Sequence, residues 1–318
     1  MNKALSYDDI LLYPQQGVVA SRSEVDISAS LNGWRFRMPI MSSPMETVTD
    51  HRFAQYMRGC GVLGVIHRFG SVDSFGNKID ERYINNISSP HAVAIGYDEL
   101  SAKIPQYVSI AVLDVAHSDT EPTLRAVEGF KKVNPHVFLI VGSIATYNAA
   151  RRAINAGADA LRVGIGAGAA CTTRTVTGFG VPMVTSIQEV AAVAQTHDIP
   201  VIADGGIKTT GDIVKALAVG ADWVMMGRMF AGVEESPRGT DYFGQASVKS
   251  AAHTGRHVEG EVGTVQPSGT LANVLDGIED ALRSAVSYGG GASLEEFRQR
   301  AVIQEVSPLA MVENGVRF

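Results

Sequence analysis

The feature of this chain that most constrains its fold is a series of short apolar runs, each ending in glycine or a small polar residue. Most runs are rich in Val and Ile, as strands buried on both faces are. Eight occur, at Met38–Ser42, Val62–Ile66, Ala92–Ile95, Ser109–Asp114, Val137–Val141, Ala160–Val163, Pro200–Ala203 and Trp223–Met226. Helix-compatible stretches lie between most of them, such as Thr123–Lys132, Thr146–Asn155, Ile187–Thr196 and Thr210–Val219. This alternation predicts a parallel sheet.

Eight such units favour a (β/α)8 barrel, for which roughly 250 residues are typical; the chain has 318. Residues 156–164 resemble residues 219–227, since each segment has a glycine at a helix end, an Ala-Asp pair, a buried strand and a second glycine. Gly157 and Gly220 can each take the left-handed conformation of a helix cap. Repeating units of similar size suit a closed barrel, and an open doubly wound sheet is the alternative.

The residues outside the repeating pattern are expected to belong to the same domain, 1–318. Residues 1–36 form an N-terminal arm, and residues 269–318 form C-terminal helices and a tail. Residues 233–268, rich in Gly, Glu and Ser, form an insertion after the eighth strand. Long ordered loops at this position are usually functional, so we expect a flap over the barrel mouth.

The composition excludes several classes of function. The formal net charge is 27 − 33 = −6, and no block of like charge indicates a surface for nucleic acid or an anionic membrane. No apolar run reaches the roughly 18 residues of a membrane span. Cys60 and Cys171 are the two cysteines and form no disulfide or zinc pattern, which favours a reducing compartment. We therefore expect a cytoplasmic protein that binds neither nucleic acid nor membrane.

The candidate site lies in the loops after the last three strands, because barrels of this type place their active site at the carboxyl ends of the strands. The loop Gly164–Arg174 has three glycines before Cys171, where a thiolate would be exposed and stabilised. The alternative is a simple turn followed by a small buried cysteine. The loops Ala203–Ile207 and Met226–Arg228 follow strands seven and eight, where this fold often binds phosphate.

Two aspartates end strands beside these loops. Asp204 can accept hydrogen bonds from two ribose hydroxyls, or it can cap the following helix. Asp114 is a second candidate partner of ribose or substrate, or it belongs to a strand-end turn. Together the loops predict a nucleotide phosphate site beside a nucleophilic thiol.

Six segments carry motifs that occur in this order from about residue 5 to residue 300: Leu5–Pro14, Met41–Thr49, Gly64–Arg68, Gly164–Arg174, Asp204–Ile207 and Leu282–Ser284. They resemble the signatures of the IMP dehydrogenase and GMP reductase family. The resemblance implies a purine nucleoside monophosphate as substrate, a nicotinamide cofactor and, as is usual in this family, a homotetramer. It also implies roles for individual residues.

By this resemblance, Cys171 is the nucleophile that attacks C2 of the purine and forms a covalent thioimidate-type adduct. Thr173 and Glu259 match the residues that handle the proton of the leaving amine or attacking water; Glu259 is otherwise a solvated loop carboxylate. The substrate-binding matches are Ser42, Met45, Asp204, Gly205, Gly206, Gly227, Arg228 and Gly244. The cofactor-binding matches are Asp114 and Arg174. Gly166, Gly168 and the carbonyl of Cys171 resemble the potassium-binding turn of some members.

Several features favour the reductase, which converts GMP to IMP and ammonia with NADPH. Cys171–Arg174 and Thr177–Gly180 resemble the reductase loop. Only 25 residues, 67–91, separate the second and third strands, too few for the regulatory subdomain of most dehydrogenases. Where dehydrogenases have an Arg-Tyr pair that activates water, this chain has Val248-Lys249.

Other interpretations stay open. An IMP dehydrogenase, which converts IMP to XMP with NAD, is one: His67-Arg68, Asp114–His117 and Glu234–Pro237 resemble bacterial dehydrogenases equally well, and Arg256 could act as a base. A flavin-dependent oxidase or phosphosugar isomerase would share the phosphate loops but not Cys171 in this setting. A protein that only binds purine nucleotides would not need Cys171 with its proton relay.

One departure from the family pattern concerns the phosphate. Ala169 stands where the family usually has a phosphate-binding serine, and Arg228 stands where serine or glycine is more common. We infer that Arg228 replaces the lost hydroxyl with a charged contact to phosphate. The same change could accommodate a modified nucleotide, or Arg228 could point to solvent or an interface.

Overall fold

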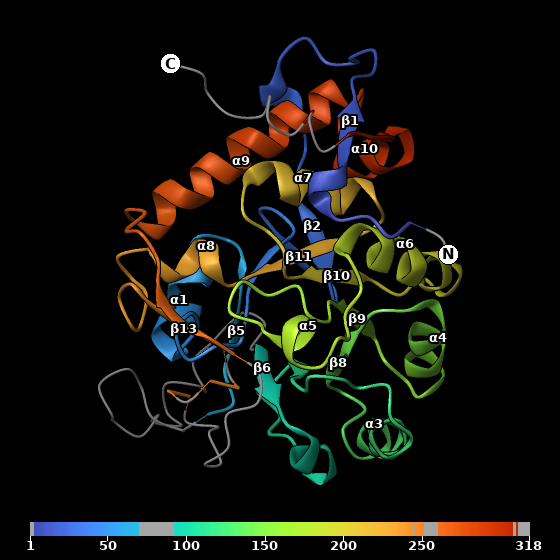
Figure 1. The fold of residues 1–318 in the computed structure, drawn as a ribbon, viewed down its shortest axis with the longest axis vertical. Helices are drawn as coiled ribbons and strands as arrows, with labels where there is room; N and C mark the ends of the chain where they lie inside the picture. Colours follow the sequence, from blue (N-terminus) through green and yellow to red (C-terminus); the bar gives the residue numbers. More distant parts are fainter. Residues whose placement is uncertain are drawn as a thin grey trace.

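Eight parallel strands close into a barrel in the computed structural model, which describes residues 3–69, 92–244, 246–247, 249–250, 260–307 and 310 (Figure 1). The strands are β4 (Ile40–Ser42), β5 (Leu63–Ile66), β6 (Ala92–Ile95), β7 (Ile110–Leu113), β8 (Phe138–Ile144), β9 (Ala160–Val163), β10 (Val201–Asp204) and β11 (Trp223–Met226). Parallel pairing of β11 with β4 closes the ring. The predicted (β/α)8 barrel is therefore confirmed, and the open sheet is excluded.

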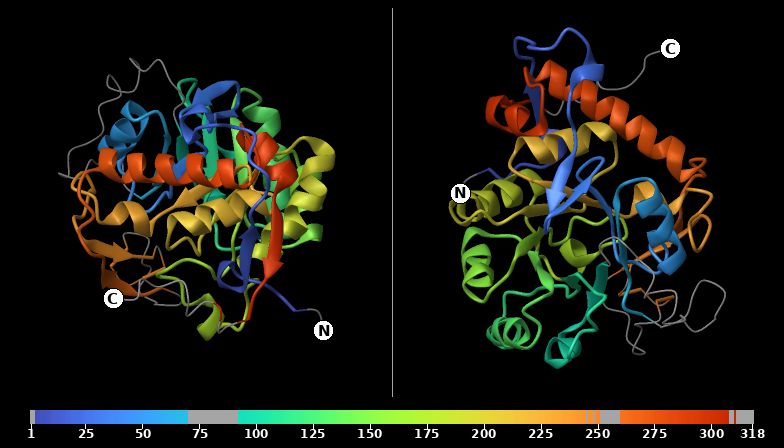
Figure 2. Two further views of the ribbon diagram at one scale, coloured as in Figure 1. Left: turned by 90° about the horizontal axis from the view of Figure 1, so that it is seen from above. Right: turned by 180° about the vertical axis from the view of Figure 1, so that it is seen from behind.

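Helices follow most strands and cover the outside of the barrel (Figures 1 and 2). They are α1 (His51–Gly59), α3 (Glu121–Val133), α4 (Tyr147–Asn155), α5 (Thr173–Val176), α6 (Met183–Ala194), α7 (Thr210–Ala218), α8 (Arg228–Ala231), α9 (Leu271–Tyr288) and α10 (Leu294–Arg300). Threonine side chains cap α3, α4 and α7 by accepting backbone N–H groups, which satisfies donors that a helix start leaves free. Within the described residues, no helix combines the length and apolar character needed to cross a membrane.

A hairpin of β2 (Ala29–Leu31) and β3 (Trp34–Phe36) closes the amino-terminal end of the barrel. Phe36 packs edge-on against Trp223, the first residue of β11, with ring centroids 5.1 Å apart. Apolar strand residues fill the barrel interior around this contact. Because the barrel interior is packed at this end, the carboxyl ends of the strands are where this fold places its ligands.

The N-terminal arm returns along the barrel and meets the end of the described chain. Its strand β1 (Ile10–Tyr13) pairs antiparallel with β14 (Val302–Glu305), and Lys3 forms an ion pair with Glu305. The short helices η1 (Tyr7–Asp9) and η2 (Arg22–Glu24) flank β1. Residues far apart in sequence therefore lie side by side at this surface.

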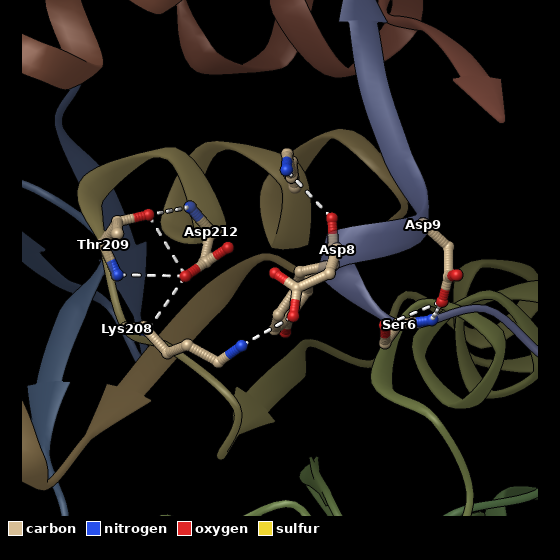
Figure 3. A network of polar contacts seen from close by, with 8 residues as sticks. Ser6, Asp8, Asp9, Lys208, Thr209 and Asp212 are labelled. Carbon is tan, nitrogen blue, oxygen red and sulfur yellow. Dashed lines mark hydrogen bonds and ion pairs between the residues drawn. The ribbon is translucent and has the colours of Figure 1, made fainter. Parts of the chain in front are cut away.

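The arm is also tied to the loop after β10 (Figure 3). Lys208 Nζ donates to Asp8 at 2.6 Å, and Asp212 accepts the backbone N–H groups of Lys208 and Thr209, both at 2.9 Å. The buried Lys215 of α7 donates to the carbonyl of Tyr7 at 2.9 Å. These bonds fix the loop that contains the predicted phosphate site.

Candidate active site

The Cys171 loop leaves the end of β9 and presents the thiol at the barrel mouth. The Cys171 side chain is exposed, which excludes the alternative of a buried cysteine. Its N–H donates to the carbonyl of Gly168 at 3.1 Å, and its Sγ lies 3.1 Å from Oγ1 of Thr173 at the start of α5. A thiol that contacts a hydroxyl in this way can exchange a proton with it.

The loops after β9 and β10 pack directly on each other. A Cβ added at Gly205 would lie 3.1 Å from the backbone carbon of Ala167, and the φ of +104° at Gly205 favours glycine in any case. The next residue of the loop after β10, Gly206, lies against the N-terminal arm: a Cβ added at Gly206 would be 3.3 Å from the ring of Tyr7. The Cys171 loop, the Asp204–Ile207 loop and the N-terminal arm thus form one packed layer.

Arg174 lies across its own loop. Its Nη2 donates to the carbonyl of Val181 at 3.1 Å. A Cβ added at either Gly166 or Gly180 would lie 2.8 Å from its Cγ. The structure therefore shows this side chain bracing the Cys171 loop; contact with a cofactor stays a prediction, as does a potassium site at Gly166, Gly168 and Cys171.

Asp204 and Asp114 are joined by an arginine that sequence reasoning missed. Arg162 of β9 donates through Nε to Asp204 at 2.7 Å and through Nη1 to Asp114 at 3.0 Å. Burial alone lowers the pKa of Arg162, but the two carboxylates outweigh it and raise that pKa above its ordinary value. The signal in the sequence was a single charged residue in an otherwise apolar strand, because a buried charge needs a partner.

Two adjacent serines, Ser42 at the end of β4 and Ser43 directly after it, have different surroundings. Ser42 is fully buried and accepts a hydrogen bond from Thr49 Oγ1 at 2.7 Å. Ser43, the next residue, donates to Oδ1 of Asp204 at 3.4 Å. Of the two serines, Ser43 therefore faces the charged groups of the site, and contact between Ser42 and substrate stays a prediction.

A buried tyrosine, which sequence reasoning also missed, faces the loop after β11. Tyr242 of β12 (Asp241–Phe243) places its hydroxyl 3.8 Å from Sδ of Met45. A Cβ added at Gly227 would lie 3.1 Å from that hydroxyl and 3.0 Å from Met45 Sδ. Burial, together with the charge of Asp204, raises the pKa of Tyr242. The phenol therefore stays protonated and can donate a hydrogen bond to an anion.

Arg228 begins α8 directly after Gly227 and is exposed. In the described part of the chain its guanidinium makes no hydrogen bond or ion pair. Its positive charge lowers the pKa of Tyr242 and so partly offsets the larger raising effect of burial. Gly227, Tyr242 and Arg228 thus offer backbone, hydroxyl and guanidinium groups in one place, which suits a phosphate.

The insertion after β11 contacts the Cys171 loop. Its strands β12 and β13 (Val262–Thr264) pair as a hairpin. The N–H of Glu261 donates to the carbonyl of Ala170 at 2.9 Å, and the N–H of Gly244 donates to the carbonyl of Glu261 at 3.4 Å. Gly244 therefore lies beside the active-site loop.

Three residues of the insertion that entered the predictions, Glu259, Arg256 and Val248, lie outside the described residues. Lys249 is described and lies 3.8 Å from Asp241 as an ion pair. Ser250 donates to the buried Glu46 at 2.8 Å, which attaches this part of the insertion to the loop after β4. The role of Glu259 stays a prediction.

Comparison with known proteins identifies the family. The model of the IMP dehydrogenase / GMP reductase domain matches residues 4–317. A protein named GMP reductase from Lactococcus lactis subsp. cremoris is 35% identical over 315 residues, covering 92% of this chain and 93% of the relative. GMP reductases from Lysinibacillus sphaericus and Oceanobacillus iheyensis are 35% and 36% identical, with 94% of each chain covered. The chain therefore belongs to the IMP dehydrogenase / GMP reductase family.

Proposed function

We propose that the protein is a GMP reductase, which converts GMP to IMP and ammonia with NADPH. The observation that carries the proposal is the exposed thiol of Cys171, 3.1 Å from the Thr173 hydroxyl. It is supported by relatives that cover more than nine tenths of the chain and are named GMP reductase. A nucleophile beside a hydroxyl is what addition to C2 and loss of an amine require.

The reaction proceeds in two stages at C2 of the purine. The Cys171 thiolate adds to C2, and the exocyclic amine leaves as ammonia after it is protonated through Thr173, with Glu259 as the source of the proton. When bound, NADPH supplies the hydride that C2 receives. The C–S bond then breaks, so that IMP leaves and Cys171 regains its thiolate. GMP, NADPH and two protons thus give IMP, NADP+ and ammonium.

The groups that hold the substrate come from the loops after β10 and β11 and from β12. Asp204 accepts the ribose hydroxyls, and the backbone of Gly206 and Gly227 binds the phosphate together with Tyr242 and Arg228. Ala169 offers no hydroxyl in the Cys171 loop, so Arg228 supplies the additional contact.

The cofactor ribose is bound by Asp114. This assignment is supported by the buried Oδ2 of Asp114, which accepts no hydrogen bond from the described residues. Its other oxygen is bound by Arg162. Oδ2 is ion-paired with Arg68 Nε at 3.5 Å, but it accepts no hydrogen bond from the described residues and can take one from a ribose hydroxyl. Potassium at the Gly166–Cys171 turn, a homotetramer and a cytoplasmic location are carried over from the family as further predictions.

The test follows nicotinamide absorbance in two parallel reactions, GMP with NADPH and IMP with NAD. We expect GMP-dependent loss of NADPH absorbance that disappears in Cys171→Ala. Cys60→Ala removes the other cysteine, which is half-buried, and should keep the activity. Absorbance gained only with IMP and NAD would instead establish a dehydrogenase. No change in either reaction would direct the search to modified nucleotides.

A further inference from the structure

Arg162 lies between two carboxylates that the proposed function assigns to different ligands. Its Nε and Nη1 bind Asp204 and Asp114 at 2.7 Å and 3.0 Å. The side chains of Arg162, Asp114 and Asp204 are only 11%, 5% and 16% exposed. Solvent screens these buried charges only weakly, so a change in the charge of one carboxylate alters the electrostatic energy of the other.

The ion pairs continue toward both edges of the barrel mouth. Oδ2 of Asp114 lies 3.5 Å from Nε of Arg68, which follows β5. At the other end, Ser43 donates to Asp204. The order Arg68, Asp114, Arg162, Asp204 alternates in sign and crosses from β5 to β10. The two carboxylates are thus linked to each other only through the guanidinium of Arg162 among the described residues.

The backbone beside Arg162 is shaped to hold the side chain in this place. The register of β8 against β9 shifts between Val141 and Ile144, so that Gly142 and Ser143 lie opposite Arg162 alone. A Cβ added at Gly142 would lie 2.5 Å from Cβ of Arg162. Bulges of this kind re-aim side chains next to active sites. The position of Arg162 is therefore set by the fold and not by a flexible surface.

We propose that Arg162 is a positioning residue that couples the two ligand sites, so that a nucleotide bound at Asp204 strengthens cofactor binding at Asp114, and the reverse. The inference rests on the proposed function. A ribose hydroxyl that donates to Asp204 reduces the negative charge that this carboxylate presents to Arg162, and so weakens the bond between them. Arg162 then bonds more strongly to Asp114 and fixes that carboxylate for its own ligand. Linkage makes the effect equal in both directions.

The experiment is calorimetric titration of GMP into the protein with and without saturating NADP+, a pair that cannot complete the reaction because NADP+ has no hydride to donate. For the wild type we expect NADP+ to tighten GMP binding by roughly fivefold or more, the lower end of usual coupling between sites. In Arg162→Lys the ratio should fall to about one, because an ammonium group lacks the planar fork that reaches both carboxylates. Titrating NADP+ with and without GMP should give the same ratios.

Two further variants make the result decisive. Arg152→Lys changes an arginine that binds Asp119 through two nitrogens, at 2.7 and 2.5 Å, away from the site; it should keep the wild-type ratio. If Arg162→Lys does not fold, Asp114→Asn is the alternative variant, because it removes the ion pair between Arg162 and Asp114. It should weaken the coupling and also alter GMP affinity without NADP+, although Asp114 is assigned to the other ligand.

The outcomes separate the coupling from the function. A wild-type ratio of one with both ligands bound overturns the coupling and leaves the reductase proposal standing. An unchanged ratio in Arg162→Lys, or in Asp114→Asn if the first does not fold, also overturns it. Failure of the wild type to bind GMP overturns both proposals.

Discussion

The Oγ1 atom of Thr173 lies 3.1 Å from the Sγ atom of Cys171, within the same short turn that begins α5. If this hydroxyl relays a proton to the leaving amine, Thr173→Val should lower kcat by roughly a hundredfold or more, the usual size of acid–base catalysis. The KM for GMP should change little, because the valine keeps the shape of the side chain. Steady-state kinetics with GMP and NADPH measure both constants.

Thr175→Val is the matched control for this prediction. Thr175 is in the same helix, but its hydroxyl donates to the carbonyl of Thr172 at 2.9 Å. We expect its kcat to stay near that of the wild type. Equal loss of turnover in both variants would assign the effect to the stability of α5 and not to proton transfer.

Arg228→Ala should raise the KM for GMP much more than it lowers kcat. The guanidinium is exposed and unpaired among the described residues, so its removal leaves the fold intact and takes away one contact to phosphate. A hydrogen bond to a charged group contributes about 1.5–3 kcal/mol, which corresponds to roughly ten- to a hundredfold in KM. Arg228→Lys should fall between the two. An unchanged KM would leave Arg228 without a role in binding.

Tyr242→Phe should weaken GMP binding by roughly a few fold to tenfold, the contribution of about 0.5–1.5 kcal/mol from one hydrogen bond. Because burial and nearby Asp204 raise the pKa of Tyr242, the phenol stays a donor throughout the neutral and mildly alkaline range. The difference between Tyr242→Phe and the wild type should therefore be the same at pH 6 and pH 9. A difference that vanishes at pH 9 would contradict a raised pKa.

Two glycine substitutions should change stability in opposite directions. Gly142→Ala places a Cβ 2.5 Å from that of Arg162 and should destabilise the protein by about 1–3 kcal/mol, as overpacking does. Gly129 lies within α3 with no atom inside 4 Å of an added Cβ, so Gly129→Ala should stabilise it by roughly 0.5–1 kcal/mol. Chemical denaturation measures both. A neutral Gly142→Ala would mean that the barrel adjusts there at no cost.

The barrel could be predicted because strands buried on both faces are recorded directly as apolar runs between helices. The limits of β8 were harder, since the strand continues past Val141 to Ile144. Its last residues belong to the shifted register opposite Arg162, which depends on a neighbouring strand. No local pattern contains that information.

The site could be predicted where the residue type alone indicates the reaction, as the nucleophilic thiol of Cys171 does. It could be predicted less well where the role of a residue depends on the direction in which its side chain points. Ser42 and Ser43 are adjacent, and only the turn after β4 determines which hydroxyl meets Asp204. Tyr242 looks like an ordinary strand residue until the hairpin brings it against Gly227. Predicting the role of Arg162 required knowing that β10 pairs with β9 and that β7 lies only one strand beyond β8, so that Asp204 and Asp114 are both within reach of the guanidinium.

The pairing of β1 with β14 brings Lys3 and Glu305 together, so the backbone nearly forms a ring. The pairing continues past Glu305, since the N–H of Val306 donates to the carbonyl of Asp9 at 2.9 Å. A circular permutant should therefore keep residues 306–318, join the two termini of the sequence with a linker and open the chain elsewhere. The exposed turn at Asp198, between η4 (Gln195–His197) and the start of β10, lies at the amino-terminal end of the strands and is a suitable place for the new ends. The order in which the barrel strands are synthesised would then change, while the packing of the Cys171 loop, the Asp204–Ile207 loop and the N-terminal arm would stay the same.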